Sequence, residues 1–254
     1  MDPAAQLDSS VQIGPGVVIG PHVKIGADTE IGPHTVIEGH TTVGARNKIL
    51  QFASLGATPQ DLKYRGEPSR LEIGDDNLIR EFTTIHRGTE GGGMVTRVGN
   101  HVLVMNYAHI AHDCIIEDHV ILANSTNLAG HCVIEEWAVT MGLCGVHQFT
   151  RIGAHAALAA GSKVAQDVPP YSLVAGEGRA RLVGLNEVGL ERRGFSPEVI
   201  RALRRSLRLL FYSNLSRAQA TKQVMETEGH IAEVRRLIDF ITNSKRGVVG
   251  RSRD

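Results

Sequence analysis

Aliphatic residues recur at every sixth position through most of the chain, in three runs separated by two interruptions. A six-residue period matches neither a helix, with about 3.6 residues per turn, nor a long strand, whose sides alternate every two residues. Glycine often follows these frame residues, and a small or β-branched residue often stands four places after them. The pattern is typical of a parallel β-helix, a solenoid of stacked coils. The frame consists of Leu7, Ile13, Ile19, Ile25, Ile31, Ile37, Val43, Ile49 and Leu55, then Ile73, Ile79 and Ile85, then Val98, Val104, Ile110, Ile116, Leu122, Leu128, Ile134, Thr140 (the one exception), Val146, Ile152, Leu158 and Val164.

Three hexads make one triangular coil of about 18 residues, and coils stack roughly 4.8 Å apart through backbone hydrogen bonds. The frame holds about 24 hexads, which predicts about eight coils. The interruptions, Ala57 to Leu71 and Gly88 to Arg97, predict loops thrown out of the coil. The second contains Gly91-Gly92-Gly93, which indicates mobility. Loops on a rigid scaffold often carry function.

The frame ends at Val164, and Pro169-Pro170 cannot donate to a further ladder of backbone hydrogen bonds. We therefore predict a mainly β fold, with a β-helix over residues 1–171, a connection over 172–195 and a small α-helical domain over 196–254. Ser196-Pro197-Glu198 is a helix start, with serine as N-cap and proline in the first turn. A second helical pattern runs from Ser216 to Ile241 and breaks near Gly229. This domain is expected to cover the C-terminal end of the β-helix.

The chain carries 27 basic and 27 acidic residues, so its overall charge gives no reason to expect a nucleic-acid or membrane partner. No apolar stretch reaches membrane-spanning length and no signal peptide opens the chain, which predicts a cytoplasmic protein. The three cysteines stand in the small inward position of their hexads and agree with a reducing compartment, as buried free thiols. One basic cluster is either a solvated helix face or a surface for an acidic protein partner; it comprises Arg201, Arg204, Arg205 and Arg208.

The chain has 12 histidines, and several of them fall near the expected corners of the coils. His109, His112 and Asp113 place two imidazoles and a carboxylate close together, and His131 lies about one coil beyond His112. Three neutral imidazoles with a water could bind a catalytic zinc ion. Alternatively, one imidazole could act as a general base on a hydroxyl. The spacing does not choose between these, and histidines that only hydrogen-bond along the wall are a third interpretation.

A set of longer motifs narrows the choice. They are Gln51-Phe52-Ala53-Ser54, Asp61-Leu62-Lys63-Tyr64, Ile85-His86-Arg87-Gly88-Thr89, His109-Ile110-Ala111-His112-Asp113-Cys114, Leu128-Ala129-Gly130-His131, Val146-His147-Gln148-Phe149, Gln166-Asp167-Val168-Pro169-Pro170-Tyr171 and Arg192-Arg193-Gly194-Phe195. Together they resemble the UDP-N-acetylglucosamine O-acyltransferase family of bacterial lipid A biosynthesis, and the resemblance runs nearly end to end. It implies a homotrimer of left-handed parallel β-helices, with active sites between subunits and no cofactor. The implied reaction moves an (R)-3-hydroxyacyl group from acyl carrier protein to the glucosamine 3-hydroxyl of UDP-N-acetylglucosamine, the first step of that pathway.

The resemblance also assigns residues. His112 matches the general base, Asp113 the carboxylate that supports its imidazolium, and Gly130 the backbone N–H that donates to the oxyanion. Ala160 stands where the family sets acyl length, and its small side chain implies a medium-to-long chain. No residue is implied as a metal ligand. The implied substrate contacts are Asp61, His131 and Gln148 for the sugar, Lys63, His86, His109 and His147 for the pyrophosphate or acyl chain, and Asn186, Arg192 and Arg193 for the nucleotide end.

Two features of the chain depart from the pattern of this family. Val188 stands where the family often has glutamate, and one residue is inserted between Gly176 and Gly184, so the residues expected at the uridine end of the site match the family least.

Other interpretations of the sequence compete with this resemblance. A γ-class carbonic anhydrase shares the solenoid but lacks the Pro-Pro-Tyr and Arg-Arg-Gly motifs. The N-acyltransferase of the same pathway carries an extra N-terminal domain, whereas the repeats here begin by Leu7. Transfer to a 3-amino sugar nucleotide would use the same residues, and a non-enzymatic scaffold leaves the imidazole cluster unexplained.

Overall fold

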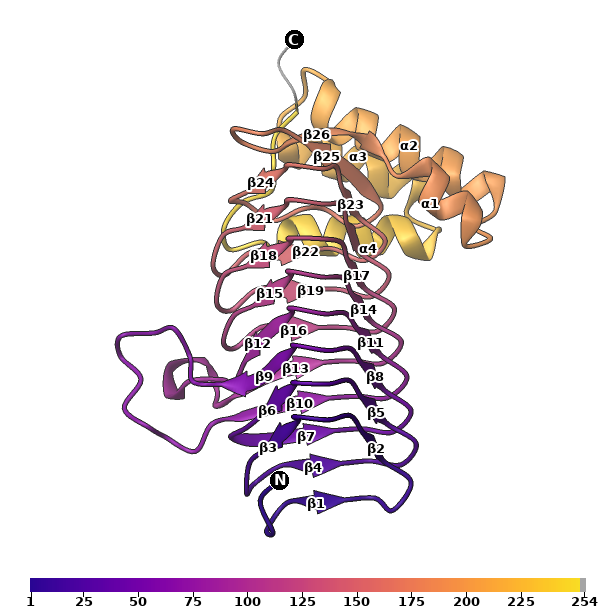
Figure 1. The fold of residues 1–254 in the computed structure, drawn as a ribbon. Coiled ribbons are helices and arrows are strands. Elements are labelled where there is room, and N and C mark those ends of the chain that lie inside the picture. Colours follow the sequence, from indigo (N-terminus) through magenta and orange to yellow (C-terminus); the bar gives the residue numbers. More distant parts are fainter. Residues whose placement is uncertain (252–254) are drawn as a thin grey trace.

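A computed structural model describes residues 1–251 as a triangular prism of three β-sheets with α-helices at its C-terminal end (Figure 1). Sheet A contains β1 (Gln6–Leu7), β4 (Lys24–Ile25), β7 (His40–Val43), β10 (Arg70–Ile73), β13 (Val95–Val98), β16 (Ile115–Ile116), β19 (Val133–Ile134) and β22 (Arg151–Ile152). Sheet B contains β2 (Gln12–Ile13), β5 (Glu30–Ile31), β8 (Lys48–Ile49), β11 (Leu78–Ile79), β14 (Leu103–Val104), β17 (Ile121–Leu122), β20 (Val139–Thr140), β23 (Ala157–Leu158), β25 (Ser172–Ala175) and β26 (Arg181–Leu185). Sheet C contains β3 (Val18–Ile19), β6 (Val36–Ile37), β9 (Ser54–Ala57), β12 (Thr84–His86), β15 (His109–Ile110), β18 (Asn127–Leu128), β21 (Gly145–Val146) and β24 (Lys163–Val164).

Strands β1 to β24 make eight coils of three parallel strands, which confirms the left-handed parallel β-helix and its coil number. The regular register joins residues one coil apart, such as Leu7 with Ile25. Frame residues from Ile19 to Val164 are buried, because they fill the inside of the prism. Ile13, in the first coil, is 42% exposed because no coil lies beneath it. The three cysteines are buried and free, as predicted.

Most corners, from the one after Ile25 onward, contain a left-handed residue three places after a frame residue. Asp28 and His131, for example, have φ of 55° and 62°. Glycine directly after a frame residue has another cause: a Cβ on Gly26 would lie 2.8 Å from the carbonyl carbon of Gly44 in the next coil. Close approach of the coils, rather than a positive φ, therefore favours glycine there. Ring side chains of successive corners stack in rows, and one row comprises His34, Phe52, Phe82 and Tyr107.

Both predicted loops leave the corner between sheets C and A. Loop 58–69 joins β9 to β10, and loop 87–94 joins β12 to β13 and contains the short 3-10 helix η1 (Glu90–Gly92). The two strands that follow begin slightly before the sequence pattern resumes, so the loops are shorter than predicted. In Figure 1 both loops project from the same edge of the prism.

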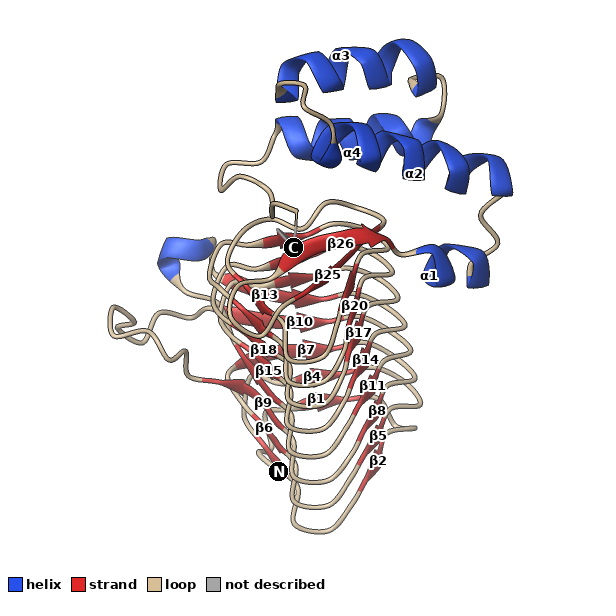
Figure 2. Ribbon diagram, turned by 90° about the horizontal axis from the view of Figure 1, so that it is seen from above, coloured by secondary structure: helices blue, strands red, loops and turns tan. Residues whose placement is uncertain are grey.

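The segment expected to be a connection has structure of its own. β25 continues sheet B, β26 pairs with it in antiparallel fashion, and α1 (Glu187–Arg192) follows. The predicted helices are α2 (Pro197–Tyr212), α3 (Arg217–Glu228) and α4 (Ala232–Thr242). Figure 2 shows these three helices grouped beyond one side of the prism. No helix among residues 1–251 is long and apolar enough to cross a membrane.

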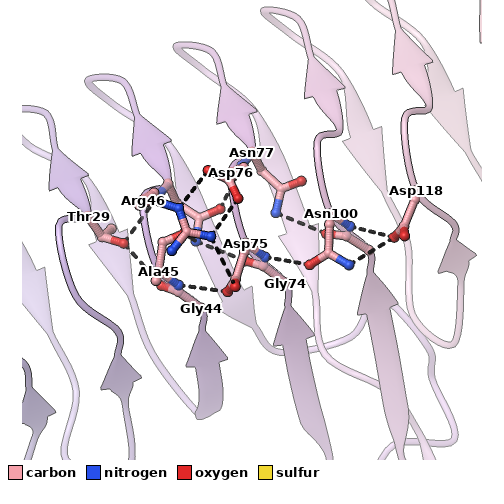
Figure 3. Close-up of polar contacts among 12 residues, drawn as sticks. Thr29, Gly44, Ala45, Arg46, Gly74, Asp75, Asp76, Asn77, Asn100 and Asp118 are labelled. Carbon is pink, nitrogen blue, oxygen red and sulfur yellow. Dashed lines mark hydrogen bonds and ion pairs between the residues drawn. The ribbon is translucent and has the colours of Figure 1, made fainter.

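The corner between sheets A and B carries a ladder of polar side chains (Figure 3). In the regular corners, the amide N–H two places after a frame residue bonds no carbonyl of the neighbouring coil. At the corner between sheets A and B, side-chain oxygens accept a hydrogen bond from this N–H. Asp75 Oδ1 accepts from Ala45 N at 2.8 Å, and Asn100 Oδ1 accepts from Asp75 N at 2.8 Å. Asp118 Oδ1 accepts from Asn100 N at 2.7 Å, so this corner leaves few backbone donors unpaired.

Glutamates extend this ladder and hold the last helix. Glu117 Oε2 and Glu135 Oε2 accept from the amides of Glu136 and Ala154, each at 3.0 Å. Arg236 in α4 donates to Glu136 at 2.9 Å and to Glu135 at 3.2 Å. The helical domain is thereby fastened to the side of the prism.

Candidate active site

His112 and Asp113 form a hydrogen-bonded pair at the corner between sheets C and A. Asp113 has the left-handed conformation of a corner residue, with φ of 61°, and its Oδ2 lies 2.7 Å from His112 Nδ1. The Asp113 side chain is fully buried, whereas 14% of the His112 side chain is exposed. Because Nδ1 donates to the carboxylate, Nε2 carries no proton in the neutral form of the ring, and in that form it can act as a base.

Gly130 lies one coil beyond His112 and contacts its ring. A Cβ built on Gly130 would stand 2.7 Å from His112 Nε2 and 2.5 Å from Cε1, so only glycine leaves room for the imidazole. Gly130 is buried, yet no acceptor among residues 1–251 bonds its N–H. Buried donors normally have partners, and an unpaired one calls for an explanation such as a ligand. The site thus combines an oriented imidazole with a free backbone donor, the two groups that acyl transfer to a hydroxyl requires.

A groove of about 740 Å³ runs over sheet C beside these residues. Its lining includes His109, His147 and Gln148 as well as His112 and Gly130. The groove therefore joins the base and the free donor to several of the predicted contact residues.

The imidazoles around His112 are uncharged at neutral pH. His86 and His109 meet edge to face, with ring centroids 4.9 Å apart, and His131 meets His112 in the same way at 5.1 Å. Burial lowers the pKa of His86 to about 4 and also lowers the pKa of His109. Burial lowers the pKa of His131 as well, against the opposing effect of Asp113. These rings can therefore hydrogen-bond a ligand without carrying charge.

Comparison with known proteins agrees with this geometry. Residues 4–39 and 96–130 match the bacterial transferase hexapeptide family, and residues 167–249 match domain 2 of UDP-N-acetylglucosamine O-acyltransferase. The chain is 50% identical over 254 residues to the acyl-[acyl-carrier-protein]--UDP-N-acetylglucosamine O-acyltransferase of Burkholderia lata. This alignment covers 98% of this chain and 96% of that relative. The chain belongs to the UDP-N-acetylglucosamine O-acyltransferase family.

Two further members of the acyltransferase family show how far the similarity extends. The Myxococcus xanthus protein of the same name is 53% identical over 207 residues, covering 81% of this chain and 80% of the relative. The solved structure of the Francisella novicida UDP-N-acetylglucosamine acyltransferase superimposes with a TM-score of 0.95 at 37% identity, covering 100% of this chain and 92% of that one. The similarity therefore includes both the β-helix and the helical domain.

One group of side chains in this acyltransferase could be taken for a metal site. His112, Asp113 and His131 form the one such group within residues 1–251, with ligand atoms within 4.8 Å of one another. However, Oδ2 of Asp113 already accepts from His112 Nδ1 and, at 2.6 Å, from Thr89 Oγ1. An ion bound to this oxygen would compete with both hydrogen bonds, and the group offers two imidazoles rather than three. The donor set fits the general-base interpretation better than the zinc interpretation.

Loop 58–69 places Gln60 in the lining of the groove and the predicted residue Asp61 near His131. Gln60 lines the groove, and the carboxylate of Asp61 is close enough to His131 to raise the pKa of that ring, against the larger lowering effect of burial. Lys63 lies on the same loop, where its N–H donates to Asp61 Oδ1 at 2.9 Å. In the single chain, the structure therefore gathers around His112 the side chains of Asp61, His86, His109, His131, His147 and Gln148.

Other predicted residues lie away from the groove of the same chain: Asn186, Arg192, Arg193 and Ala160. Asn186 Nδ2 donates to the His155 carbonyl at 2.9 Å, and the Arg193 guanidinium lies over the Trp137 ring at 5.1 Å. Both contacts are at the corner between sheets A and B. Ala160 is exposed at the corner between sheets B and C. These positions cannot reach this chain's own groove without large rearrangement.

Sequence reasoning missed the residues that hold Asp113. Thr89 donates to the Asp113 carboxylate from its backbone N at 2.8 Å and from Oγ1 at 2.6 Å. Thr96 Oγ1 accepts from Asp113 N at 2.8 Å. Thr89 ends one of the motifs that carried the resemblance, so the motif pointed to the residue without giving its role. Nothing in the hexad pattern distinguishes Thr96.

Proposed function

We propose that the protein transfers an (R)-3-hydroxyacyl group from acyl carrier protein to the glucosamine 3-hydroxyl of UDP-N-acetylglucosamine, the first step of lipid A biosynthesis. The observation that carries the proposal is the contact between His112 and Gly130, which puts a base nitrogen beside an unpaired N–H. Relatives named for this acyl transfer are about half identical to the chain over nearly its full length, such as 50% for the Burkholderia lata protein.

The proposed mechanism is direct transfer. His112 Nε2 takes the proton of the 3-hydroxyl as that oxygen attacks the thioester carbonyl carbon. The carbonyl oxygen becomes negative and accepts from the Gly130 N–H, and a fixed donor of this kind lowers the barrier by roughly 2.7–4 kcal/mol in comparable sites. The carbon–sulfur bond then breaks, and the imidazolium returns its proton to the departing thiolate. Asp113 stabilises the imidazolium through Nδ1.

The groove lining supports transfer without a covalent enzyme intermediate, since no serine or cysteine is among its residues. We assign Asp61, His131 and Gln148 to the sugar. The pyrophosphate and acyl chain are assigned to Lys63, His86, His109 and His147. The neutral rings of His86, His109 and His131 suit these roles because they can donate to sugar or phosphate oxygens without competing with His112 for its proton.

We propose a homotrimer, because an apolar surface crosses sheet B and its corner with sheet C. Partly exposed aliphatic side chains follow sheet B through successive coils, at Leu78, Leu103, Ile121 and Val139. At the adjoining corner, exposed fractions range from 43% to 72% for Phe52, Phe82, Tyr107 and Leu143. A monomer rarely exposes so continuous an apolar surface. If sheet B of one subunit packs on sheet C of the next, Asn186 and Arg193 come beside the neighbour's groove.

The proposed donor partner is acyl carrier protein, an acidic protein, and the basic face of α2 is a candidate docking surface. Arg204 and Arg205 already pair with Glu187 and Glu228 through two hydrogen bonds each. Arg201 and Arg208 are exposed on the same helix. We also propose a cytoplasmic location for the protein.

The proposal is tested by incubating the protein with UDP-N-acetylglucosamine and 3-hydroxyacyl carrier proteins of several chain lengths, and weighing the products. We expect the nucleotide sugar to gain one 3-hydroxyacyl group in an ester that mild alkali cleaves. The small side chain of Ala160 predicts a medium-to-long chain, and strong preference for a donor of about ten carbons would reject that part. Product formed only with a 3-amino sugar nucleotide would change the acceptor, and no product with any donor would refute the proposal.

A further inference from the structure

The Asp113 carboxylate is held from three directions. Its side chain has no exposed surface, and its oxygens accept from His112 Nδ1, from Thr89 N and from Thr89 Oγ1. Two of these three donors belong to Thr89, which is itself 4% exposed. A buried carboxylate depends on such donors because burial has removed its water.

Loop 87–94 folds tightly to supply these donors. Gly88 N donates to the Arg70 carbonyl at 3.0 Å, which fastens the start of the loop to sheet A. The Thr89 carbonyl accepts from Gly92 N at 3.1 Å and from Met94 N at 2.8 Å. The loop therefore turns back on Thr89 and covers the carboxylate.

The three consecutive glycines of this loop are not equivalent. A Cβ on Gly92 would lie 1.9 Å from Asp113 Cγ and 2.3 Å from Oδ2. A Cβ on Gly91 would meet nothing within 4 Å, and Gly93 has φ of 92°, which favours glycine by itself. Gly92 thus forms the roof over the Asp113 carboxylate. The sequence suggested mobility for this run, whereas the structure shows that close packing requires one of its glycines.

We propose that loop 87–94 is a clamp on Asp113, in which Thr89 is a positioning residue for the His112–Asp113 pair and Gly92 seals the carboxylate from water. The inference rests on the proposed general-base role of His112. Thr89 fixes the carboxylate, the carboxylate fixes Nδ1, and the ring then presents Nε2 beside Gly130. Without the Thr89 hydroxyl, Oδ2 keeps only His112 as a side-chain donor, and the orientation of both side chains loosens.

The test compares Thr89→Val with Thr89→Ser in the acyl-transfer assay. We expect Thr89→Val to lower kcat roughly tenfold or more, because a hydrogen bond to a charged group is lost. The KM for UDP-N-acetylglucosamine should stay within about twofold, since Thr89 lies behind the pair and away from the groove. Thr89→Ser keeps the hydroxyl and should retain most of the activity. A kcat for Thr89→Val equal to that of the parent, or equal losses in Val and Ser variants, would overturn the inference.

Two controls separate positioning from folding and from the underlying proposal. Gly92→Ala, whose Cβ would overlap Asp113, should lower both kcat and the melting temperature, whereas Gly91→Ala should change neither. In an Asp113→Ala background, Thr89→Val should cause no further loss if it acts only through the carboxylate. If Thr89→Val still costs tenfold in that background, the clamp is wrong. If the parent enzyme makes no product, or His112→Ala is fully active, the proposed function fails instead.

Discussion

Two corners of the prism are built from the same hexapeptide turn but differ in whether the backbone N–H two places after the frame residue has an acceptor. At the corner between sheets A and B, side chains such as Asp75 and Asn100 accept the amide of the neighbouring coil. At the corner between sheets C and A, the equivalent amides of His112, Gly130 and Gln148 have no acceptor among residues 1–251. The turn therefore provides a donor in each coil, and the side chains decide whether it is used for stability or left for a ligand.

The difference also concerns which residues occupy the turn. The corner between sheets A and B is capped: it has carboxylates and side-chain amides directed at backbone N–H groups, as Figure 3 shows. The corner between sheets C and A is uncapped: it has histidines, the buried Asp113, and Gly130, which contacts the ring of His112. Leaving a buried donor unpaired costs about 1–3 kcal/mol. A site that tolerates this cost gains a donor whose position is fixed before substrate arrives.

His112→Ala should have the largest effect, because it removes the base from the uncapped corner. We expect kcat to fall at least roughly a hundredfold in the acyl-transfer assay. His101→Ala is the matched change at the capped corner, where His101 stacks on His119 with centroids 4.8 Å apart, and should leave kcat within about twofold. Both variants should elute at the parent's oligomeric size. Turnover by His112→Ala within a few-fold of the parent refutes the base assignment.

Gly130→Ala should come next, since its Cβ would overlap the His112 ring. Moving the imidazole by about 1 Å is expected to lower kcat roughly a hundredfold with little change in folding. Gly142 holds the same turn position at the corner between sheets B and C, where a Cβ would lie 3.5 Å from the Asn124 carbonyl oxygen, an ordinary contact. Steady-state kinetics should therefore show Gly142→Ala near parent activity. Equal effects of the two substitutions would contradict the special role of Gly130.

Asp75→Ala should affect stability and leave kcat unchanged. It leaves the Ala45 N–H without its 2.8 Å acceptor, and we expect the free energy of unfolding to fall by about 1 kcal/mol. Asp75→Asn keeps an acceptor oxygen and should lose less. Urea denaturation at fixed protein concentration measures both. If the two variants have the same midpoint as the parent, capping does not stabilise this corner.

Glu117→Gln should change the pH dependence of stability by a smaller amount. Burial, and then the contact with Glu136, raise the pKa of Glu117 to about 7. A carboxyl with a raised pKa stabilises the fold most below its unfolded value of about 4.5, and this contribution is lost as pH rises through about 7. The difference in melting temperature, parent minus Glu117→Gln, should therefore decline as the pH rises from about 4.5 to about 7. A constant difference would mean that Glu117 does not titrate in this range.

The sequence predicted the repeated part of the molecule well because one physical rule, an inward aliphatic residue in each hexad, operates in every coil. It predicted α2 from Ser196 and Pro197, which have a local capping role. It did not predict β25, β26 and α1, which follow no repeat and depend on packing against the last coil. Thr89 was missed for a similar reason: its partner is distant in sequence, and only the folded loop brings the two together.

In the proposed mechanism, the uncapped corner brings His112 and the Gly130 amide to one reacting carbonyl. The most direct measurement is a crystal structure of the protein with its acylated nucleotide sugar. We expect the acyl carbonyl oxygen about 3 Å from Gly130 N and the sugar 3-oxygen within hydrogen-bonding reach of His112 Nε2. An ester bound elsewhere, with both groups remote from it, would refute the roles assigned to His112 and Gly130.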